Sequence, residues 1–202
     1  MRDDDPAVSV AELLTAAAGG DQTAWDTLVA RYAGLVWSVA RGYRLQVGET
    51  DDAVQNAWLR LVENLGRIHD PAHLGSWLAT TIRRECLQVL RRRGRTGYPT
   101  EDVETDAAVD PAPALDAGLL QDERSAALWA AVNTLPQRCW GLLRVLMASP
   151  PPSYAEVSAA LGIPVGSIGP TRQRCLDQLR ARVIGDPLLD DSVTSDPAEE
   201  AT

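Results

Sequence analysis

The sequence predicts an all-α protein of two small helical domains joined by a flexible acidic linker. Apolar residues recur at three- and four-residue spacing, the period of a helix, and no alternating strand pattern competes with it. Acidic stretches without periodicity interrupt this pattern, as expected of flexible chain. We expect a lead-in over residues 1–20, domains over 21–95 and 123–184, a linker over 96–122 and a disordered acidic tail over 185–202.

Three helices are expected in the first domain. The first begins at Asp21 and is broken by Gly48. Thr50 supplies the N-cap of the second, and the acidic residues after it favour its positive end. A loop follows, in which Asp70-Pro71 favours a short helical turn. The third helix begins at Trp77, and both Trp58 and Trp77 are expected in the core.

The second domain ends in a predicted helix-turn-helix. Ser153 and Glu156 form a capping box, and Gly162 ends the helix that this box starts. We place the next N-cap near Ser167, so that Pro170 falls in a first turn, where its missing N–H costs nothing. The second helix then has a buried stripe of Ile168, Cys175, Leu176 and Leu179. Its residues nearer solvent are Ser167, Thr171, Arg172, Arg174 and Gln178.

The arginine-bearing face of this second helix has two interpretations. It is either the solvent-exposed face of an ordinary helical hairpin or a row of side chains that contacts bases in the DNA major groove. The capping box, the glycine turn and the arginines together favour DNA reading.

The distribution of charge is compatible with a nucleic-acid partner, although the net charge is −9. All 19 basic residues are arginine, and residues 83–95 carry a local charge of +5. Residues 100–123 carry −8 and residues 183–202 carry −6. Phosphate contacts are local and are screened beyond a Debye length of about 10 Å, so the basic segment can bind DNA.

Several classes of function are excluded by what the sequence lacks. It has no apolar run of transmembrane length and no signal peptide, so we expect a cytoplasmic protein without membrane insertion. Cys86, Cys139 and Cys175 are widely spaced and are expected as buried thiols. No nucleophile and base pair, glycine-rich phosphate loop or metal spacing is present. We therefore expect no enzyme activity, no cofactor and no metal.

The order of the modules resembles bacterial RNA polymerase sigma factors of the extracytoplasmic-function (ECF) class. The resemblance covers Asp21–Arg95 and Glu123–Arg182. The stretches that carry it are Thr50–Arg60, Gly75–Arg84, Leu135–Arg138 and Ser153–Val157. It implies that the first module, region 2, binds the polymerase and melts the promoter at its −10 element, whereas the second, region 4, reads the −35 element.

The resemblance also implies roles for particular residues. The polymerase-facing positions are Asp51, Asp52, Gln55 and Asn56, and Asp51 and Asp52 also favour their own helix start. The −10 contacts fall in a base-capturing loop and a basic helix end, at His69, Asp70, His73, Arg83, Arg84, Gln88, Arg91 and Arg92. The −35 contacts fall at Ser167, Gly169, Pro170, Thr171, Arg172, Arg174 and Gln178.

Three departures from the family pattern are visible. Asn56 stands where the family usually has an acid, Gly169-Pro170-Thr171 replaces a basic and polar pair, and Arg172 occupies a position that is usually apolar. The acidic linker is either a soluble tether or a phosphate mimic in a polymerase channel, through Glu101, Asp102, Glu104 and Asp106.

The expected function is promoter recognition and transcription initiation together with core RNA polymerase and promoter DNA, and an anti-sigma factor is a further expected partner. Two alternatives remain open at this point. One is a stand-alone helix-turn-helix regulator that binds symmetric half-sites as a dimer. The other is an adaptor on a degenerate sigma scaffold that does not read DNA.

Overall fold

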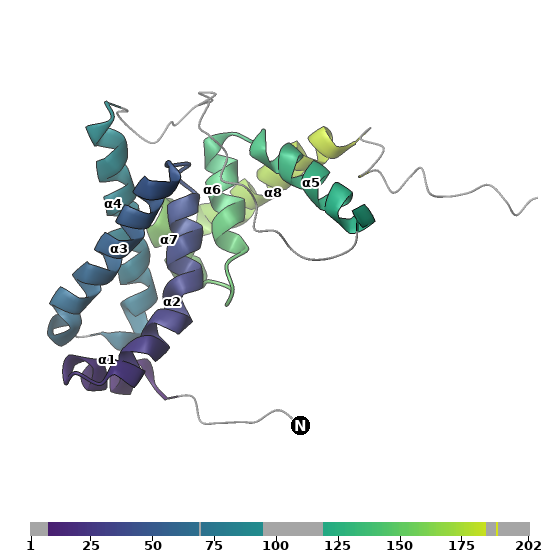
Figure 1. Cartoon of the computed structure of the whole chain (residues 1–202). Helices are drawn as coiled ribbons and strands as arrows, with labels where there is room; N and C mark the ends of the chain where they lie inside the picture. Colours follow the sequence, from purple (N-terminus) through teal and green to yellow (C-terminus); the bar gives the residue numbers. More distant parts are fainter. Residues whose placement is uncertain (1–7, 69, 95–118, 185–188, 190–202) are drawn as a thin grey trace, which may run out of the picture.

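Eight α-helices and two short 3-10 helices make up the described part of the computed structural model, which covers residues 8–68, 70–94, 119–184 and 189 (Figure 1). The α-helices are α1 (Val10–Ala18), α2 (Gln22–Arg41), α3 (Val47–Asn64), α4 (Leu74–Arg92), α5 (Leu119–Asn133), α6 (Gln137–Leu146), α7 (Tyr154–Leu161) and α8 (Val165–Val183). The 3-10 helices are η1 (Leu65–Arg67) and η2 (Pro71–His73). The predicted all-α class is confirmed for these residues.

Some sequence expectations lie outside the described residues. These are most of the linker, including its four acidic residues of interest, nearly all of the tail, and His69. Residues 119–122, which we assigned to the linker, form the first turn of α5. Among the helices of the described ranges, none combines the length and the apolar character needed to cross a bilayer.

The first helix, α1, occupies a segment that the sequence analysis treated only as a lead-in. Ser9 caps it, because the Ser9 hydroxyl accepts a hydrogen bond from the Glu12 amide and the Glu12 carboxylate accepts one from the Ser9 amide. The Ser9 hydroxyl and the Ser9 amide both donate to the Glu12 carboxylate, and these two hydrogen bonds lower the pKa of Glu12. The Ser-x-x-Glu spacing is the same signal that located α7, so α1 was also readable from the sequence.

The start of α3 lies earlier than Thr50. The Glu49 carboxylate accepts a hydrogen bond from the Gln46 amide, and the helix begins at Val47. Gly48 therefore lies inside α3 and does not separate two helices. Thr50 is buried and donates its hydroxyl to the Gln46 carbonyl, so the expectation that it caps the helix is wrong. Gly48 has a low helix propensity, but the helix-forming residues that follow it outweigh this cost.

The helix-turn-helix begins as the sequence predicts and differs at its second helix. Ser153 caps α7 through a capping box, and Gly162 ends it in the left-handed conformation with φ 67°. However, α8 begins at Val165 after Pro164, not near Ser167. A residue before proline is disfavoured in helical conformation, which prevents an earlier start. Pro170 consequently lies inside α8. Because proline has no N–H, it donates no hydrogen bond to the carbonyl one turn earlier, which belongs to solvent-exposed Gly166.

The helices α1–α4 and α5–α8 pack against each other around one continuous apolar core. The closest packing between the two sets joins α4 to α7 and α2 to α6. Leu78 and Ile82 of α4 are fully buried, as are Val157 and Ala160 of α7. Figure 1 shows the first four helices on one side of the molecule, with α5 and α8 on the other.

Hydrogen bonds from the segment after α2 cross this contact. The buried Tyr43 hydroxyl donates to the Ala160 carbonyl of α7 at 2.9 Å. The Arg44 guanidinium donates to the carbonyls of Asn133 and Leu135 at 2.8 and 3.1 Å, and it lies 4.9 Å from the ring centre of Trp140. Buried backbone carbonyls at the ends of α5 and α7 are thereby satisfied from the other half of the molecule.

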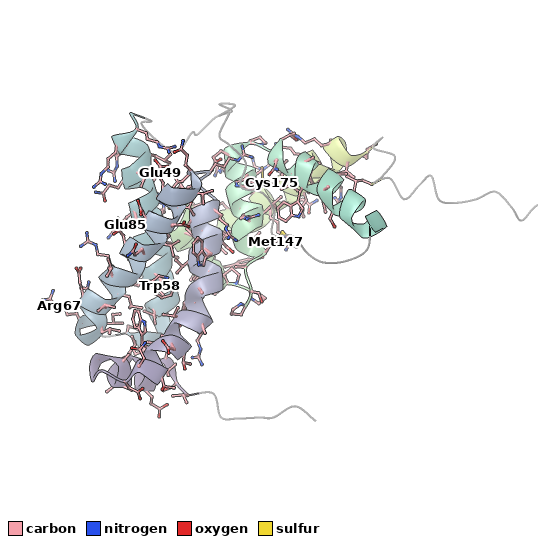
Figure 2. The ribbon with its side chains drawn as sticks, viewed as in Figure 1. Glu49, Trp58, Arg67, Glu85, Met147 and Cys175 are labelled. Carbon is pink, nitrogen blue, oxygen red and sulfur yellow. A yellow bond between two sulfur atoms is a disulfide. The ribbon has the colours of Figure 1, made fainter. Side chains whose placement is uncertain are left out.

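Two cysteines that we expected as free thiols are joined. Cys139 of α6 and Cys175 of α8 form a disulfide, and Figure 2 labels Cys175. Spacing along the chain gave no sign of this pair, because the two residues are 36 positions apart and meet only when α6 packs on α8. Cys86 of α4 is free and buried, as expected.

The contact between the two helical sets leaves no room for a side chain at Gly34. A Cβ atom there would lie 2.1 Å from the Ser149 carbonyl oxygen, which is backbone and cannot rotate away. We expect Gly34→Ala to lower the free energy of unfolding by about 1–3 kcal/mol through overpacking, as measured by urea denaturation.

Gly48→Ala is the matched control, because a Cβ at position 48 meets nothing within 4 Å. This substitution should raise the free energy of unfolding by about 0.5–1 kcal/mol, since alanine favours a helix. Equal effects of the two substitutions would contradict the described packing.

Candidate nucleic-acid and protein interfaces

The outer face of α4 carries a row of polar and basic side chains. Arg84, Gln88 and Arg91 are exposed at positions i, i+4 and i+7 of the helix, and Arg92 is exposed beside them. This row forms because the apolar positions of α4 point to the core, which leaves the intervening positions to solvent. The Arg91 Nε donates to the Leu87 carbonyl at 3.2 Å, which holds this side chain along its own helix.

Two further arginines near this row contact other parts of the protein. Arg83 is half-buried, and its guanidinium lies against the Gly162 turn between α7 and α8, where a Cβ atom would be 2.5 Å from it. Arg93 pairs with Glu49 and so joins the end of α4 to the start of α3. Arg83, which was predicted to contact DNA, thus contacts the helix-turn-helix in this structure.

The loop before α4 is organised by Asp70. Its carboxylate accepts a hydrogen bond from the Ala72 amide at 3.1 Å and contacts the His73 Nδ1 at 2.7 Å. The hydrogen bond with His73 lowers the pKa of Asp70. This Asx-type turn confirms the predicted Asp70-Pro71 helix start, and α4 begins immediately after it at Leu74 rather than at Trp77. Asp70 and His73 are both exposed.

The predicted polymerase-facing residues lie together on the exposed face of α3. Asp51, Asp52, Gln55 and Asn56 are all exposed. Asp51 and Gln55 also line a shallow hollow of about 600 Å³ between α2 and α3. The other residues that line this hollow are apolar, namely Trp25, Trp37, Val54, Trp58, Leu59 and Val62.

The apolar part of this hollow was not expected from the sequence. Trp58 was expected in the core but is half-buried, packing edge-on against Trp25 with ring centres 6.2 Å apart. Leu59 and Val62 are 52% and 51% exposed, although Val62 was expected on the apolar face. An acidic rim beside exposed aliphatic and aromatic groups is the composition of a protein-binding patch.

The exposed face of α8 differs from the predicted one. Gly169, Pro170 and Arg174 are exposed, and Ser167 is half-buried. Thr171 is only 5% exposed, so the expectation that it faces solvent is wrong. Thr171 follows Ile168 by three residues and precedes Cys175 by four, so it lies on the same buried stripe of α8, which the sequence analysis did not extend to it.

Gln173 is a residue of this face that the sequence analysis missed. It is exposed on the same side as Pro170 and Asp177, and its side-chain amide donates to the Asp177 carboxylate at 3.0 Å. Gln178, by contrast, is exposed but lies beside α6, with its Oε1 3.7 Å from the Cys139 Sγ. Glutamine can contact adenine with both its donor and its acceptor, so position 173 is chemically suited to a DNA-facing surface.

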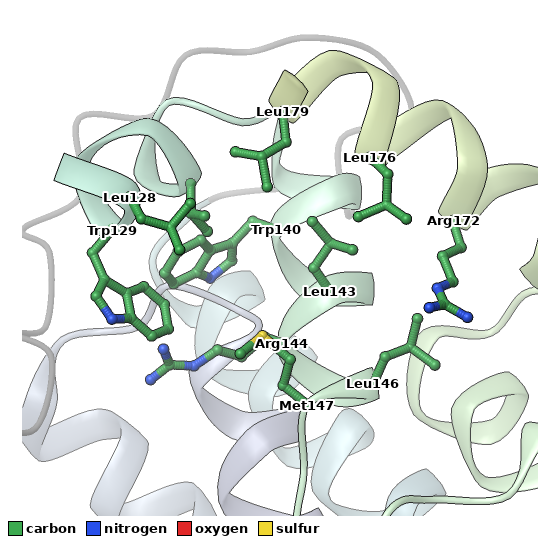
Figure 3. Close-up of a pocket in the computed structure, with 11 residues that line it drawn as sticks. Leu128, Trp129, Trp140, Leu143, Arg144, Leu146, Met147, Arg172, Leu176 and Leu179 are labelled. Carbon is green, nitrogen blue, oxygen red and sulfur yellow. The ribbon is translucent and has the colours of Figure 1, made fainter. Parts of the chain in front are cut away.

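A second apolar hollow, here called the α8 groove, lies among α5, α6 and α8 (Figure 3). It has a volume of about 320 Å³. Its apolar lining is Leu128, Trp129, Val132, Trp140, Leu143, Leu146, Met147, Leu176 and Leu179, and Arg144 and Arg172 lie at its edge. Met147 is 72% exposed, so a large apolar side chain faces solvent here.

Arg172 belongs to the α8 groove rather than to the row of Gly169, Pro170 and Gln173. It precedes Leu176 by one helical turn, and both side chains line the groove (Figure 3). The methylene stem of an arginine can cover apolar surface while its guanidinium remains in water. This placement accounts for an arginine at a position where the resembling family usually has an apolar residue.

The described residues contain no group of three or more histidine, cysteine or acidic side chains that could hold a metal ion. His73 makes its contact with Asp70 instead.

Comparison with known proteins agrees with the helical arrangement. Residues 28–96 match the family model described as Sigma-70 region 2. The ECF RNA polymerase sigma factor SigM of Mycobacterium tuberculosis is 32% identical over 177 residues, which cover 87% of this chain and 83% of SigM. SigE of Mycolicibacterium smegmatis is 32% identical over 171 residues, or 81% of this chain; the match spans 64% of SigE, which is less than two thirds of that protein.

A solved structure is similar in fold. The structure described as CnrH in complex with the cytosolic domain of CnrY has a TM-score of 0.57 and 20% sequence identity, covering 87% of this chain and 97% of that one. The similarity extends over both helical sets. The match to SigM, with the region 2 match, shows that this chain belongs to the family of ECF RNA polymerase sigma factors.

Proposed function

We propose that the protein is a promoter-specificity subunit that binds core RNA polymerase, contacts the −10 and −35 promoter elements and supports DNA opening without covalent chemistry. The observation that carries the proposal is the exposed basic row of α4 in a chain of this family, beside a separate acidic and apolar patch on α3. Such a protein acts where the polymerase is, in the cytoplasm.

The α3 patch is the proposed polymerase contact. Asp51, Asp52, Gln55 and Asn56 supply the polar part, and the neighbouring hollow supplies apolar area from Leu59 and Val62. Carboxylates orient and attract a basic partner, whereas burial of exposed apolar side chains stabilises the contact. Asn56 contributes hydrogen bonding in place of a charge.

The proposed −10 contact is the loop at Asp70 and His73, with the α4 row of Arg84, Gln88, Arg91 and Arg92. A base leaves the stack at a cost of a few kcal/mol, and cations that hold the strand's phosphates offset part of this cost. The proposed −35 contact is the exposed face of α8 around Ser167, Gly169, Pro170 and Arg174, to which we add Gln173.

The α8 groove is the proposed contact for a protein partner. An exposed apolar hollow with arginines at its edge fits an amphipathic segment with acidic residues, from the polymerase or from an inhibitory anti-sigma protein. Arg172 is therefore proposed to act in this groove rather than as a base reader.

The proposed function is tested with purified full chain, core polymerase and promoters selected from random DNA. We expect transcription from selected promoters that depends on the chain, because only the holoenzyme recognises both elements. DNA binding to palindromic sites without polymerase would contradict the proposal and identify a dimeric regulator. Polymerase binding without sequence preference would contradict it in favour of an adaptor.

Charge reversal on α3 tests the polymerase contact. We expect Asp51→Arg with Asp52→Arg to weaken binding to core polymerase about tenfold at low salt, or roughly 1.4 kcal/mol, through loss of attraction to a basic surface. Fluorescence anisotropy of the labelled chain measures this affinity. Glu63→Gln is the control, because Glu63 is an exposed acid of α3 outside the proposed contact. The double variant changes the charge by +4 and the control by +1, so a loss of binding free energy in the control of about a quarter of that in the double variant would mean that only net charge matters.

Removal of α4 arginines tests the −10 contact. In the holoenzyme, Arg84→Ala with Arg92→Ala should reduce the slope of log affinity against log salt for single-stranded −10 DNA by about 1.4, since each phosphate contact contributes about 0.7. Arg182→Ala, at an exposed position near the end of α8, should leave the slope unchanged. An unchanged slope in the double variant would show that the α4 row does not hold the strand.

A further inference from the structure

We propose that Gln173 of α8 contacts an adenine of the −35 element in the DNA major groove, and that Asp177 positions the Gln173 side-chain amide for this contact. The inference deepens the proposed function and rests on it, because the −35 element is the DNA that α8 is proposed to meet. It is carried by the lack of side chains along one exposed stripe of α8, by the bond that holds Gln173 and by the charge of the helix.

One exposed stripe of α8 has no hydrogen-bonding side chain over its first two turns. Gly166, Pro170, Gln173 and Asp177 follow one another at spacings of four, three and four residues, and all four are exposed. This spacing places them on one side of the helix, opposite its buried side. Gln173 is therefore the first residue along this stripe whose side chain can form a hydrogen bond.

Packing within the protein does not explain the glycine at position 166. A Cβ atom built there meets no atom of the described residues within 4 Å. Its backbone is helical, so no left-handed conformation calls for glycine either. Glycine and proline are the least favourable residues inside a helix, yet Gly166 and Pro170 share this stripe. Glycine suits positions where a backbone approaches a ligand closely, which indicates that the stripe faces a binding partner.

The major groove of DNA fits a stripe of this kind. The groove is about 12 Å wide, and a helix with its side chains is about 10–12 Å across. Side chains on the facing side therefore limit how closely a helix approaches the base edges. Without them over the first two turns, α8 can lie deeper, and Gln173 is the next side chain to meet the bases. The helix carries four arginines and one aspartate, a net charge of +3, which suits the phosphates that flank the groove.

A hydrogen bond within α8 leaves the Gln173 amide with the pattern that complements adenine. The Gln173 Nε2 donates to the Asp177 Oδ1 at 3.0 Å, which occupies one of the two amide N–H groups. One N–H and the Oε1 remain. Adenine presents the acceptor N7 beside the N6 amino donor, whereas guanine presents two acceptors. The remaining groups thus form two hydrogen bonds with adenine and only one with guanine.

Arg180 makes an acidic residue tolerable beside DNA. Its Nη1 donates to the same Asp177 Oδ1 at 3.1 Å, so the charge of the carboxylate is offset locally. Asp177 does not contact the base in this arrangement. It acts through Gln173 and is a positioning residue.

The test measures base preference in the holoenzyme formed from the full chain and core polymerase. Competition binding compares a promoter selected from random DNA with every single base-pair substitution in its −35 element. For the wild-type chain, we expect one position at which G·C in place of A·T weakens binding about tenfold, through loss of a two-bond contact. Gln173→Ala should abolish this difference and leave the preferences at the −10 element unchanged. Gln178→Ala is the control, because that glutamine of α8 lies beside α6, and it should retain the difference.

Substitution of Asp177 tests the positioning role. Asp177→Ala frees the second amide N–H for guanine, so the ratio of A·T to G·C affinity at this position should fall about threefold or more. Asp177→Asn should retain the ratio, because its side-chain oxygen still accepts the bond from Gln173. Both variants remove one negative charge and strengthen binding to every sequence, so only the ratio reports on positioning.

Gly166→Ala tests the close approach of the helix. It should raise the midpoint of urea unfolding, because alanine favours a helix, and yet weaken promoter binding about threefold by a clash with the base edges. Gly48→Ala is the matched control, since a Cβ there also meets no described atom within 4 Å. It should raise the midpoint and leave promoter affinity unchanged. Unchanged promoter affinity in Gly166→Ala would contradict the close approach.

The remaining outcomes separate this inference from the proposed function. If the wild-type chain supports promoter-dependent transcription but shows no −35 position that prefers A·T, the inference is wrong whether or not any variant folds. Identical base preferences in Gln173→Ala and the wild-type chain would also overturn it, and an unchanged ratio in Asp177→Ala would remove the positioning role. Lack of promoter-dependent transcription by the wild-type chain would instead overturn the proposed function, and the inference with it.

Discussion

The structure depends on the contact between two helical sets that share one apolar core. Each set accepts hydrogen bonds or packing from the other, since the Tyr43 hydroxyl donates to a carbonyl near the end of α7 and Arg44 donates to the carbonyls of Asn133, the last residue of α5, and Leu135. Trp140 in turn donates its indole N–H to the Arg41 carbonyl at 3.2 Å. Buried backbone groups without partners cost about as much as a lost hydrogen bond, so these contacts favour the arrangement as a whole.

This shared core determines which surfaces remain for partners. Once α4 packs on α7 and α2 on α6, the exposed faces are the row of α4, the patch of α3, the outer side of α8 and the α8 groove. Three of these surfaces differ clearly in character, because the α4 row is basic, the α3 patch is acidic and apolar, and the α8 groove is an apolar hollow. The net charge of −9 conceals this local separation. Arg83 is the point where the core contact and the basic face meet, because its guanidinium lies on the Gly162 turn.

Local signals in the sequence predicted much of this fold. The capping box at Ser153 and the glycine at 162 define α7, and the spacing of apolar residues places the basic row of α4 on the outside. Features that depend on long-range packing were missed. Packing on α8 buries Thr171 and places Arg172 at the groove, and the Cys139–Cys175 bond forms only where α6 meets α8. Such features depend on contacts between segments far apart in sequence, which periodicity does not report.

The claim of one shared core is tested most directly by equilibrium unfolding in urea, followed by tryptophan fluorescence and by far-ultraviolet circular dichroism on the same samples. Trp25 and Trp58 report on the first helical set, and Trp129 and Trp140 report on the second. A single cooperative transition with the same midpoint by both probes is the predicted result. Two resolved transitions, with one set unfolding while the other stays intact, would contradict it.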